Sequence, residues 1–480
     1  MAPSNTDSPE IGLALSGGGF RATLFHLGVV RAMAEAGMLQ RVTHITSVSG
    51  GSVLAAHLVL NWAKYCEAPT AKQIDPFEQA TQRLVKLIES DVRNRILRRL
   101  PWYIVKRFLI WLFLVTIGRI LREPAKKRLN RAVENCTSVH ILRVILDDFF
   151  REKNLAQMST AGAPKLAILA TEVSRMTHAW FTSDGFDQPL ASSPAGADLI
   201  TVGLGVAASA AFPAIFPPVR LDGEKYLFDS HRSDRFITDA GVYDNLGISG
   251  FLGDPFPKTI PRVFVSDATA TRDWASGASL NILTSLLRSV DIIQQRGADL
   301  QRDAVHLPLR DAWLGTAPPG IQTAGRFVLF DIAQDQIKER PMVPATIQRH
   351  LSYIRTDFDA FSACEGRELV HHGYSVAWNG LRELGVFPPD AEPRFDKWKA
   401  DWPWPESNAS LDSTIDKMTE GQRSRIRLFS WSDPFGVLNT CVLLLLLVSP
   451  WFIWHTATKV ATRTTSEMRA DAKAQESEKP

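Results

Sequence analysis

A run of three glycines followed by an arginine stands near the start of the chain, in LALSGGGFRATLFHLG (residues 13–28). Glycine adopts backbone angles that other residues avoid, and it lets a ligand come close to the main chain. The helix expected after this loop offers unpaired N–H groups and the positive end of its dipole. Gly17, Gly18 and Gly19, with Arg21 just after them, are therefore predicted to hold a negative charge. That charge is either a phosphate or one that develops during a reaction.

A serine among small residues is the second candidate. The pentapeptide SVSGG at 47–51 follows the pattern G-x-S-x-G of a nucleophile elbow, except that Ser47 stands in the first glycine position. In such an elbow a tight strand-to-helix turn exposes the central serine, and small residues on both sides let the flanking backbones pass. Ser49 is therefore the candidate nucleophile, with Gly50 and Gly51 as the small residues after it.

An aspartate at the end of an apolar strand is the third candidate, in FITDAGVYDNLG. Ala240 and Gly241 follow Asp239 directly, and both are small enough to let its carboxylate approach a partner closely. An aspartate in a turn is common, so this residue alone indicates little. Together with the glycine loop and the serine turn it becomes a candidate functional group.

The elements around these residues predict an α/β fold. Buried strands are expected at 11–16, 41–47, 165–173 and 262–268, with helices at 21–37 and 50–65 after the first two strands. Strand, helix, strand and helix within about 55 residues are typical of a parallel sheet. We therefore expect a three-layer α/β domain with a central, mostly parallel sheet.

A dinucleotide site is the main competing interpretation of the glycine loop, because Gly17, Gly19 and Ala22 also satisfy G-x-G-x-x-A. That fingerprint requires an acidic residue at the end of the second strand to bind the ribose. The second strand, at 41–47, contains no acidic residue and ends at the serine turn. The dinucleotide interpretation therefore fails.

The motifs SGGGFR, SVSGGS and TDAGVYDNLG, in this order, resemble the oxyanion loop, the nucleophile elbow and the D-G-G/A motif of the patatin-like phospholipases. ASAAFPAIFPPV at 208–219 resembles the small-residue and proline block of that family, and SGGGFRA and SGGS also resemble the cytosolic phospholipase A2 catalytic domain. The resemblance covers about residues 8–270. The chain departs from the family pattern at Ser47, Ala22 and Ala240, each a small residue in place of glycine.

The resemblance implies a Ser-Asp dyad in which Ser49 is the nucleophile and Asp239 accepts its proton, with no histidine between them. It implies an oxyanion hole that we expect to consist of Gly17, Gly18, Gly19 and Arg21. The implied reaction is hydrolysis of a fatty-acyl ester of a phospholipid or lysophospholipid through an acyl-enzyme. No cofactor, metal or nucleic acid is expected: the four cysteines are scattered and the net charge is only +3.

Three other functions stay open. The first is a Ser-His-Asp triad, for which the histidines after the aspartate are His306, His350, His371 and His372. His26 and His44 lie nearer in sequence but are expected to pack within their helix and strand. The second is a membrane scaffold that kept the fold without catalysis. The third is a lipid acyltransferase that uses the same site.

Residues 435–454 carry no charge over 20 positions, which is long enough for a transmembrane helix. Equal numbers of Lys and Arg on its two sides leave the orientation open, and the polar N-terminus favours a cytoplasmic catalytic domain. The expected organisation is a flexible N-terminus at 1–9, the catalytic domain at 10–385, a connector at 386–434, the single-pass helix at 435–454 and a polar disordered tail at 455–480.

A basic and apolar insertion is expected at about 90–131. Residues 93–131 carry twelve basic side chains and one acidic one, Glu123, around the apolar run FLIWLFLVTIG at 108–118. Eleven residues are short for a membrane span. The composition indicates contact with an anionic lipid surface, and the alternative is a basic helix packed on the protein.

Overall fold

The structure is a computed structural model, and it describes most of the chain between residues 10 and 388 together with short segments beyond. The described residues are 10–67, 76–117, 120–189, 193–213, 215–228, 233–269, 289–290, 292–302, 326–333, 342–388, 391–393, 411–422, 434–435 and 437–442. The expected N-terminus at 1–9 and the tail at 455–480 lie outside these residues, as does most of the segment 435–454.

A single mixed sheet forms the centre of the fold. Its parallel half has the order β10-β9-β1-β2-β3, made of Phe327–Asp331, Arg262–Asp267, Ile11–Leu15, Val42–Ser47 and Lys165–Glu172. Beyond β3 the strands are antiparallel: β4 (Thr177–Thr182), β5 (Gly185–Asp187), β6 (Ala195–Gly196), β7 (Val219–Leu221) and β8 (Arg235–Thr238). The four strands expected from the sequence are present, and the α/β fold with a largely parallel centre is confirmed.

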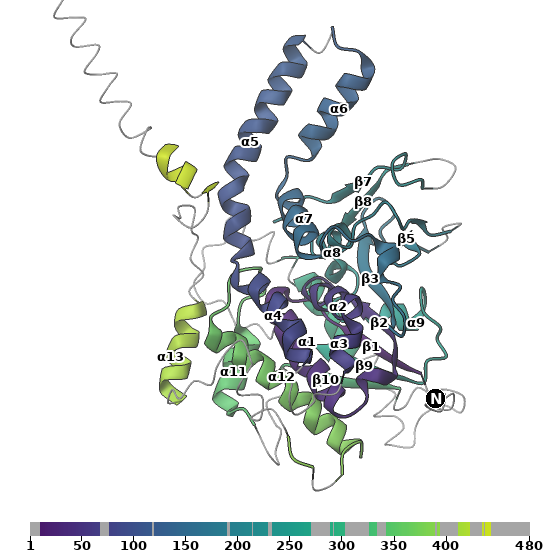
Figure 1. Cartoon of the computed structure of the whole chain (residues 1–480), viewed down its shortest axis with the longest axis vertical. Helices are drawn as coiled ribbons and strands as arrows, with labels where there is room; N and C mark the ends of the chain where they lie inside the picture. The colour runs from purple at the N-terminus through teal and green to yellow at the C-terminus, as the bar shows by residue number, and fades with distance from the viewer. Residues whose placement is uncertain are drawn as a thin grey trace, which may run out of the picture.

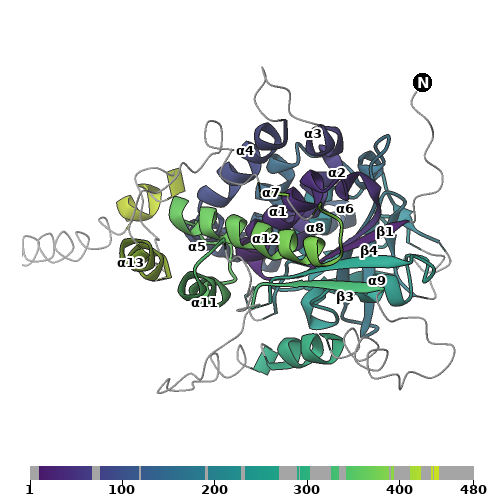
Figure 2. The same ribbon diagram turned by 90° about the horizontal axis from the view of Figure 1, so that it is seen from below.

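The sheet separates two hydrophobic cores. Successive side chains of a strand point to opposite faces, so Leu13 and Leu15 enter one core while Ala14 enters the other. Helices α1 (Gly19–Glu35), α2 (Gly50–Leu60) and α12 (Ala363–Glu383) cover the first face, and α9 (Ser249–Leu252) lies on the second (Figure 2).

Helices α1 and α12 approach each other closely enough to require glycine on both sides. A Cβ at Gly28 of α1 would overlap the carbonyl oxygen of Val370, and a Cβ at Gly373 of α12 would overlap that of Phe25. The C-terminal part of the domain is therefore packed directly on the helix that follows the glycine loop.

The remaining helices surround this core. They are α3 (Trp62–Cys66), α4 (Pro76–Glu89), α7 (Ser138–Phe149), α8 (Val202–Ser209), α11 (Ala345–Tyr353) and α13 (Leu411–Gln422), with short 3₁₀ turns at Leu39–Arg41, Leu155–Met158 and Ala240–Val242. Helix α13 lies within the expected connector.

The insertion forms a helical hairpin that projects from the body of the domain (Figure 1). Its first helix, α5, spans Val92–Ile117 and includes Pro101, and its second, α6, spans Glu123–Glu134. Residues 108–117 of the apolar run form the last part of this 26-residue helix, whose length was not predicted from the sequence. Among the described residues, α5 is long and apolar enough to cross a membrane, and its apolar part is not buried.

The start of the 435–454 segment contacts this hairpin. Residues 437–442 are helical. Trp102 of α5 donates a hydrogen bond from Nε1 to Oδ1 of Asn439 (2.8 Å), and Asn439 donates from Nδ2 to the carbonyl of Arg98 (3.1 Å). The described start of the 435–454 segment therefore lies against the first half of α5.

Candidate active site

Ser49 occupies a strained turn between β2 and α2. Its backbone angles are φ +49° and ψ −118°, a region that non-glycine residues rarely adopt. Its N–H donates to Oγ of Ser209 (2.9 Å), which helps to hold the turn. A Cβ at Gly50 would overlap the carbonyl of Gly19, and one at Gly51 would lie 2.7 Å from the last carbonyl of β1. The turn therefore has the geometry expected of a nucleophile elbow, and it is packed against the glycine loop.

The glycine loop supplies two N–H groups beside this serine. Gly18 and Gly19 have φ of +136° and +56°, and a Cβ at Gly19 would overlap the carbonyl oxygen of Thr356. The N–H of Gly17 donates to the carbonyl of Asn245 (3.0 Å). The N–H groups of Gly18 and Gly19 have no acceptor within the described part of the chain, and they stand at the N-terminus of α1.

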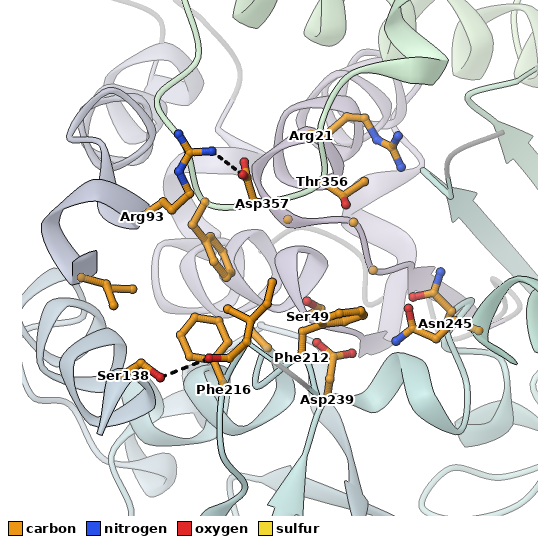
Figure 3. A pocket seen from close by; sticks show the side chains of 18 of the residues that line it. Arg21, Ser49, Arg93, Ser138, Phe212, Phe216, Asp239, Asn245, Thr356 and Asp357 are labelled. Atoms are coloured by element: carbon orange, nitrogen blue, oxygen red, sulfur yellow. Dashed lines mark hydrogen bonds and ion pairs between the residues drawn. The ribbon is translucent and has the colours of Figure 1, made fainter. Parts of the chain in front are cut away.

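Arg21 contacts main-chain carbonyls from distant segments. Its guanidinium is fully buried and donates to the carbonyls of Ser352 and Ile354 (3.1 Å each) and to that of Ala268. In Figure 3 the side chain extends away from Ser49. These contacts favour a role for Arg21 in positioning the glycine loop over direct contact with an oxyanion.

Asp239 lies beside Ser49 at the end of β8 (Figure 3). Its Oδ1 accepts a hydrogen bond from the N–H of Gly241 (2.7 Å), and its own N–H donates to the carbonyl of Ala211 (3.1 Å). Burial raises the pKa of Asp239 to about 7, although hydrogen bonds from the Gly241 N–H and the Ser49 side chain act in the opposite direction. The carboxyl is thus poised to exchange a proton near neutral pH.

Small residues fit the motif positions around these groups. Ser47 and Ala240 are buried, so the departures from glycine at both positions are accommodated. A Cβ at Gly241 would lie 2.7 Å from Oδ1 of Asn245 and 3.0 Å from Oδ1 of Asp239. Gly241 is therefore the position in this motif where a side chain would disturb the carboxylate.

These groups open into a cavity of 390 Å³. Its polar side holds the glycine loop, Ser49 and Asp239. Its apolar side is formed by two segments, the first turns of α5 and the loop after α8, through Ile96, Leu97, Leu100, Phe212, Ile215 and Phe216. Sequence analysis missed these residues, although the i, i+3 spacing of apolar residues in α5 indicates a buried face there.

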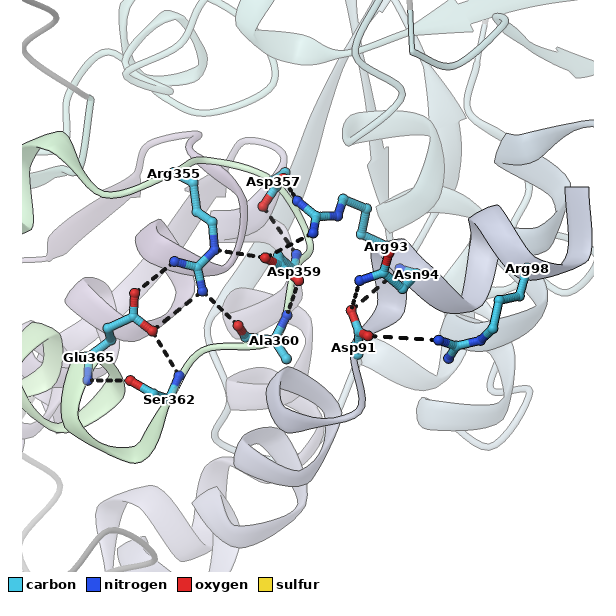
Figure 4. Close-up of polar contacts among 10 residues, drawn as sticks. All are labelled: Asp91, Arg93, Asn94, Arg98, Arg355, Asp357, Asp359, Ala360, Ser362 and Glu365. Atoms are coloured by element: carbon cyan, nitrogen blue, oxygen red, sulfur yellow. Dashed lines mark hydrogen bonds and ion pairs between the residues drawn. The ribbon is translucent and has the colours of Figure 1, made fainter. Parts of the chain in front are cut away.

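A loop at 354–362 closes the cavity beside the glycine loop. The N–H of Phe20 donates to the carbonyl of Asp357 (3.3 Å), and the ring of Phe20 packs edge-on against Phe358 at 4.9 Å between centroids. Arg93 at the base of α5 forms ion pairs with Asp357 (2.6 Å) and Asp359 (3.0 Å) (Figure 4). Sequence analysis missed this loop too, because it carries no motif.

Asp359 also pairs with Arg355 at 3.1 Å, and Arg355 pairs with the buried Glu365 at 2.7 Å (Figure 4). Burial raises the pKa of Asp359, and the two arginines Arg93 and Arg355 act against that shift. The base of α5 is thus joined to α12 through a chain of charges.

No described histidine lines the cavity. His26 is buried behind the glycine loop, where Nε2 donates to the carbonyl of Ser16 (2.9 Å) and Nδ1 accepts from Oγ of Ser266 (2.6 Å). Burial lowers the pKa of His26 to about 4, so it is neutral and supports the strand ends.

The other histidines named above lie elsewhere. His44 packs edge-on against Phe256, His350 contacts the carbonyl of Thr346 and His372 donates to that of Ile332. Burial lowers the pKa of His371 to about 3. His306 lies outside the described residues. Over the described ranges, no three potential metal ligands cluster.

The fold is that of an α/β protein with a strained serine turn between a central strand and the helix after it. Residues 13–252, half of the chain, match the family model of the patatin-like phospholipases, so the chain belongs to this family. Its members are typically serine hydrolases acting on lipid acyl esters.

Similar solved structures are distant. Human GIVD cytosolic phospholipase A2 shares 12% identity at a TM-score of 0.45, over 79% of this chain and 60% of that one. The chain thus spans less than two thirds of the human protein's length. VipD from Legionella pneumophila shares 13% identity at a TM-score of 0.31, over 78% of this chain and 67% of that one. No curated protein matches the chain.

Proposed function

We propose that the protein is a serine lipid acyl hydrolase that cleaves fatty-acyl esters of phospholipids or lysophospholipids at a membrane surface. The observation that carries this proposal is the cavity itself. A strained serine, a buried carboxyl group and two N–H groups without acceptors within the described residues line one side, and apolar side chains line the other.

In the proposed first half-reaction, Asp239 accepts the proton of the Ser49 hydroxyl as Oγ attacks the ester carbonyl carbon. The carbonyl oxygen becomes negatively charged, and the N–H groups of Gly18 and Gly19 donate to it. One such donor is worth about 3–4 kcal/mol when measured by its removal. Collapse of the intermediate breaks the ester C–O bond, and Asp239 returns its proton to the departing alcohol.

In the second half-reaction, water attacks the acyl-enzyme and transfers its proton to Asp239. Release of the fatty acid restores the Ser49 hydroxyl with that proton. A carboxylate with a pKa of about 7 suits both directions of transfer near neutral pH, because it is neither a very weak base nor a very weak acid there.

The apolar side of the cavity supports an acyl substrate. Ile96, Leu97 and Leu100 of α5 face Phe212 and Phe216 across a space of 390 Å³, which falls in the usual range for small-ligand sites. A fatty-acyl chain would bury its methylene groups here, each contributing about 0.8 kcal/mol.

We further propose that residues 435–454 form a single-pass transmembrane helix with the catalytic domain on the cytoplasmic side. The uncharged length of this segment and the tryptophans at its ends support the span. The contact of Asn439 with Trp102 places the start of the segment beside α5, close to the cavity.

Fluorophosphonate labelling of the full chain in detergent tests the proposed function. Wild type is expected to label and to release fatty acid from mixed phospholipid micelles, whereas Ser49→Ala is expected to do neither. Ser90→Ala is the matched control, since its hydroxyl does not line the cavity; it donates to the carbonyl of Leu87 (2.7 Å) and accepts from Arg95 (3.3 Å). Labelling of Ser49→Ala, or no labelling of wild type, would contradict the assignment. Transfer of the acyl group to added glycerol would identify an acyltransferase instead.

A further inference from the structure

The cavity-lining face of α5 continues along the helix as an exposed apolar stripe. Residues three or four apart lie on one face of a helix. Starting from the cavity, this spacing connects Leu97, Leu100, Ile104, Phe108, Trp111 and Val115. The last four are 58%, 57%, 53% and 58% exposed, values that are high for large apolar side chains on a protein surface.

The exposed half of α5 is apolar on its other faces as well. Leu109, Leu112 and Phe113 are also exposed, and no charged residue occurs from 108 to 117. A helix that packs in a protein groove needs only one apolar face, whereas a helix surrounded by hydrocarbon is apolar all round. The pattern therefore favours lipid over a protein partner.

Basic residues lie at both ends of this apolar part. Lys106 and Arg107 are exposed where it begins, and Arg122 is exposed after its end. Long basic side chains extend toward lipid headgroups while their helix lies deeper, and anionic headgroups attract them. This arrangement fits a helix held between hydrocarbon and headgroups.

The length of the apolar part limits how deep it reaches. Ten uncharged residues of helix measure about 15 Å, which is half of the roughly 30 Å of hydrocarbon in a bilayer. Helix α6 returns beside α5 with Lys126, Lys127 and Arg128, which do not belong in hydrocarbon. Lys127 and Arg131 also pair with Glu224 (2.7 Å) and Asp222 (2.9 Å) of the domain body. Although α5 as a whole is long enough to cross a membrane, its uncharged part alone is not, and the hairpin therefore fits one leaflet.

We propose that α5 docks the catalytic domain on a lipid bilayer by inserting residues 108–117 into one leaflet. The cavity then opens beside the hydrocarbon from which an acyl chain is drawn. This inference rests on the proposed function and names the surface through which that site meets its substrate. The apolar half of α5 contacts the membrane, while the paired basic residues of α6 bind the hairpin to the domain body.

Fluorescence quenching by brominated phospholipids tests the insertion independently of catalysis. The full chain is reconstituted in phosphatidylcholine–phosphatidylglycerol vesicles, and the Trp111 signal is obtained by subtracting the emission of Trp111→Phe. We expect stronger quenching by lipids brominated in the upper half of the acyl chain than by lipids brominated near its end. Absence of quenching would refute insertion, and strongest quenching at the chain ends would refute a one-leaflet position.

A double substitution tests the consequence for activity. Phe108→Glu/Val115→Glu is expected to lower hydrolysis of vesicle phospholipid by about tenfold or more, because carboxylates are costly in hydrocarbon. Hydrolysis of a monomeric short-chain ester should change by less than about twofold, since that substrate reaches the cavity from water. The matched control is Val144→Glu, a 41% exposed apolar residue on α7.

Unchanged vesicle hydrolysis in the double variant would overturn the proposal, as would an equal loss in Val144→Glu. Failure of wild type on the short-chain ester would instead count against the proposed hydrolase. The quenching experiment would still decide the position of α5.

Discussion

The Ser49 side of the cavity is built mainly from backbone, whereas the α5 side is built from side chains. On the first side, Gly19, Gly50 and Gly51 bring main-chain segments into contact, and the N–H groups of Gly18 and Gly19 lie beside Ser49. On the second side, apolar side chains of α5 form the wall and the ion pairs of Arg93 hold it in place. We call the Ser49 side the backbone wall and the α5 side the side-chain wall. The backbone wall tolerates almost no added atom, whereas the volume of the side-chain wall can be changed one side chain at a time.

Asp239→Asn should give the largest effect, because it removes the proton acceptor and keeps the shape. We expect kcat to fall by about 10⁴-fold, as when the carboxylate of a hydrolase triad is converted to an amide. Steady-state kinetics on a monomeric ester measures this change. A loss smaller than tenfold would mean that another group accepts the proton.

Gly19→Ala tests the intolerance of the backbone wall. Its Cβ would overlap the Thr356 carbonyl and displace the N–H donors, so we expect at least about a hundredfold loss of kcat, the cost of one oxyanion donor. Gly37→Ala is the matched control, because Gly37 also has positive φ (+67°) but its Cβ would meet nothing within 4 Å. That control should lose about 1 kcal/mol of stability and no activity. Equal activity of Gly19→Ala and Gly37→Ala would contradict the conclusion that the backbone wall tolerates almost no added atom.

The pH profile connects the carboxyl to catalysis. Asp239 accepts a proton only when ionised, and its pKa is raised to about 7 by burial. We therefore expect kcat/KM to fall about tenfold per pH unit below pH 7 and to level off above it. A profile that stays flat down to pH 5 would contradict this assignment.

The raised pKa of Asp239 also affects stability, which should fall as the pH rises, whereas activity should increase. Burial disfavours the charged form, so the folded state binds the proton more tightly than the unfolded state does. The free energy of unfolding should decline as the pH rises from about 4 to about 7. Asp239→Asn should therefore raise Tm more at pH 8 than at pH 4, which thermal unfolding at the two pH values measures. An equal change at both would show that the carboxyl is not destabilised by burial.

Arg93→Met tests how much the ion pairs of Arg93 stabilise the side-chain wall. It removes two ion pairs and leaves Asp357 and Asp359 without this arginine, so we expect a loss of about 1–2 kcal/mol, between the values for exposed and buried pairs. Lys127→Met, which removes the exposed pair with Glu224, should cost less than about 1 kcal/mol. Denaturant unfolding compares the two, and the reverse order would contradict the role given to Arg93.

Local sequence was enough to predict the turn at Ser49. Strand, turn and helix signals around Ser49 are contiguous, so the elbow and its neighbouring strands could be placed from the sequence. The contacts of Arg21 could not, because their acceptors, such as Ser352, lie more than 300 residues away. The length of α5 was also missed, since Pro101 and the pair Lys106–Arg107 interrupt its apolar pattern although the helix continues through them.

The support of the glycine loop by Thr356, Ser352 and Ile354 has a consequence for protein synthesis. All three motifs lie within the first 250 residues or so, yet the carbonyls on which Gly19 and Arg21 rest are made about a hundred residues later. A nascent chain that has just emerged with Asp239 therefore carries every motif and lacks the frame that fixes them. Translation order delays assembly of the site until the last helices of the domain have been synthesised.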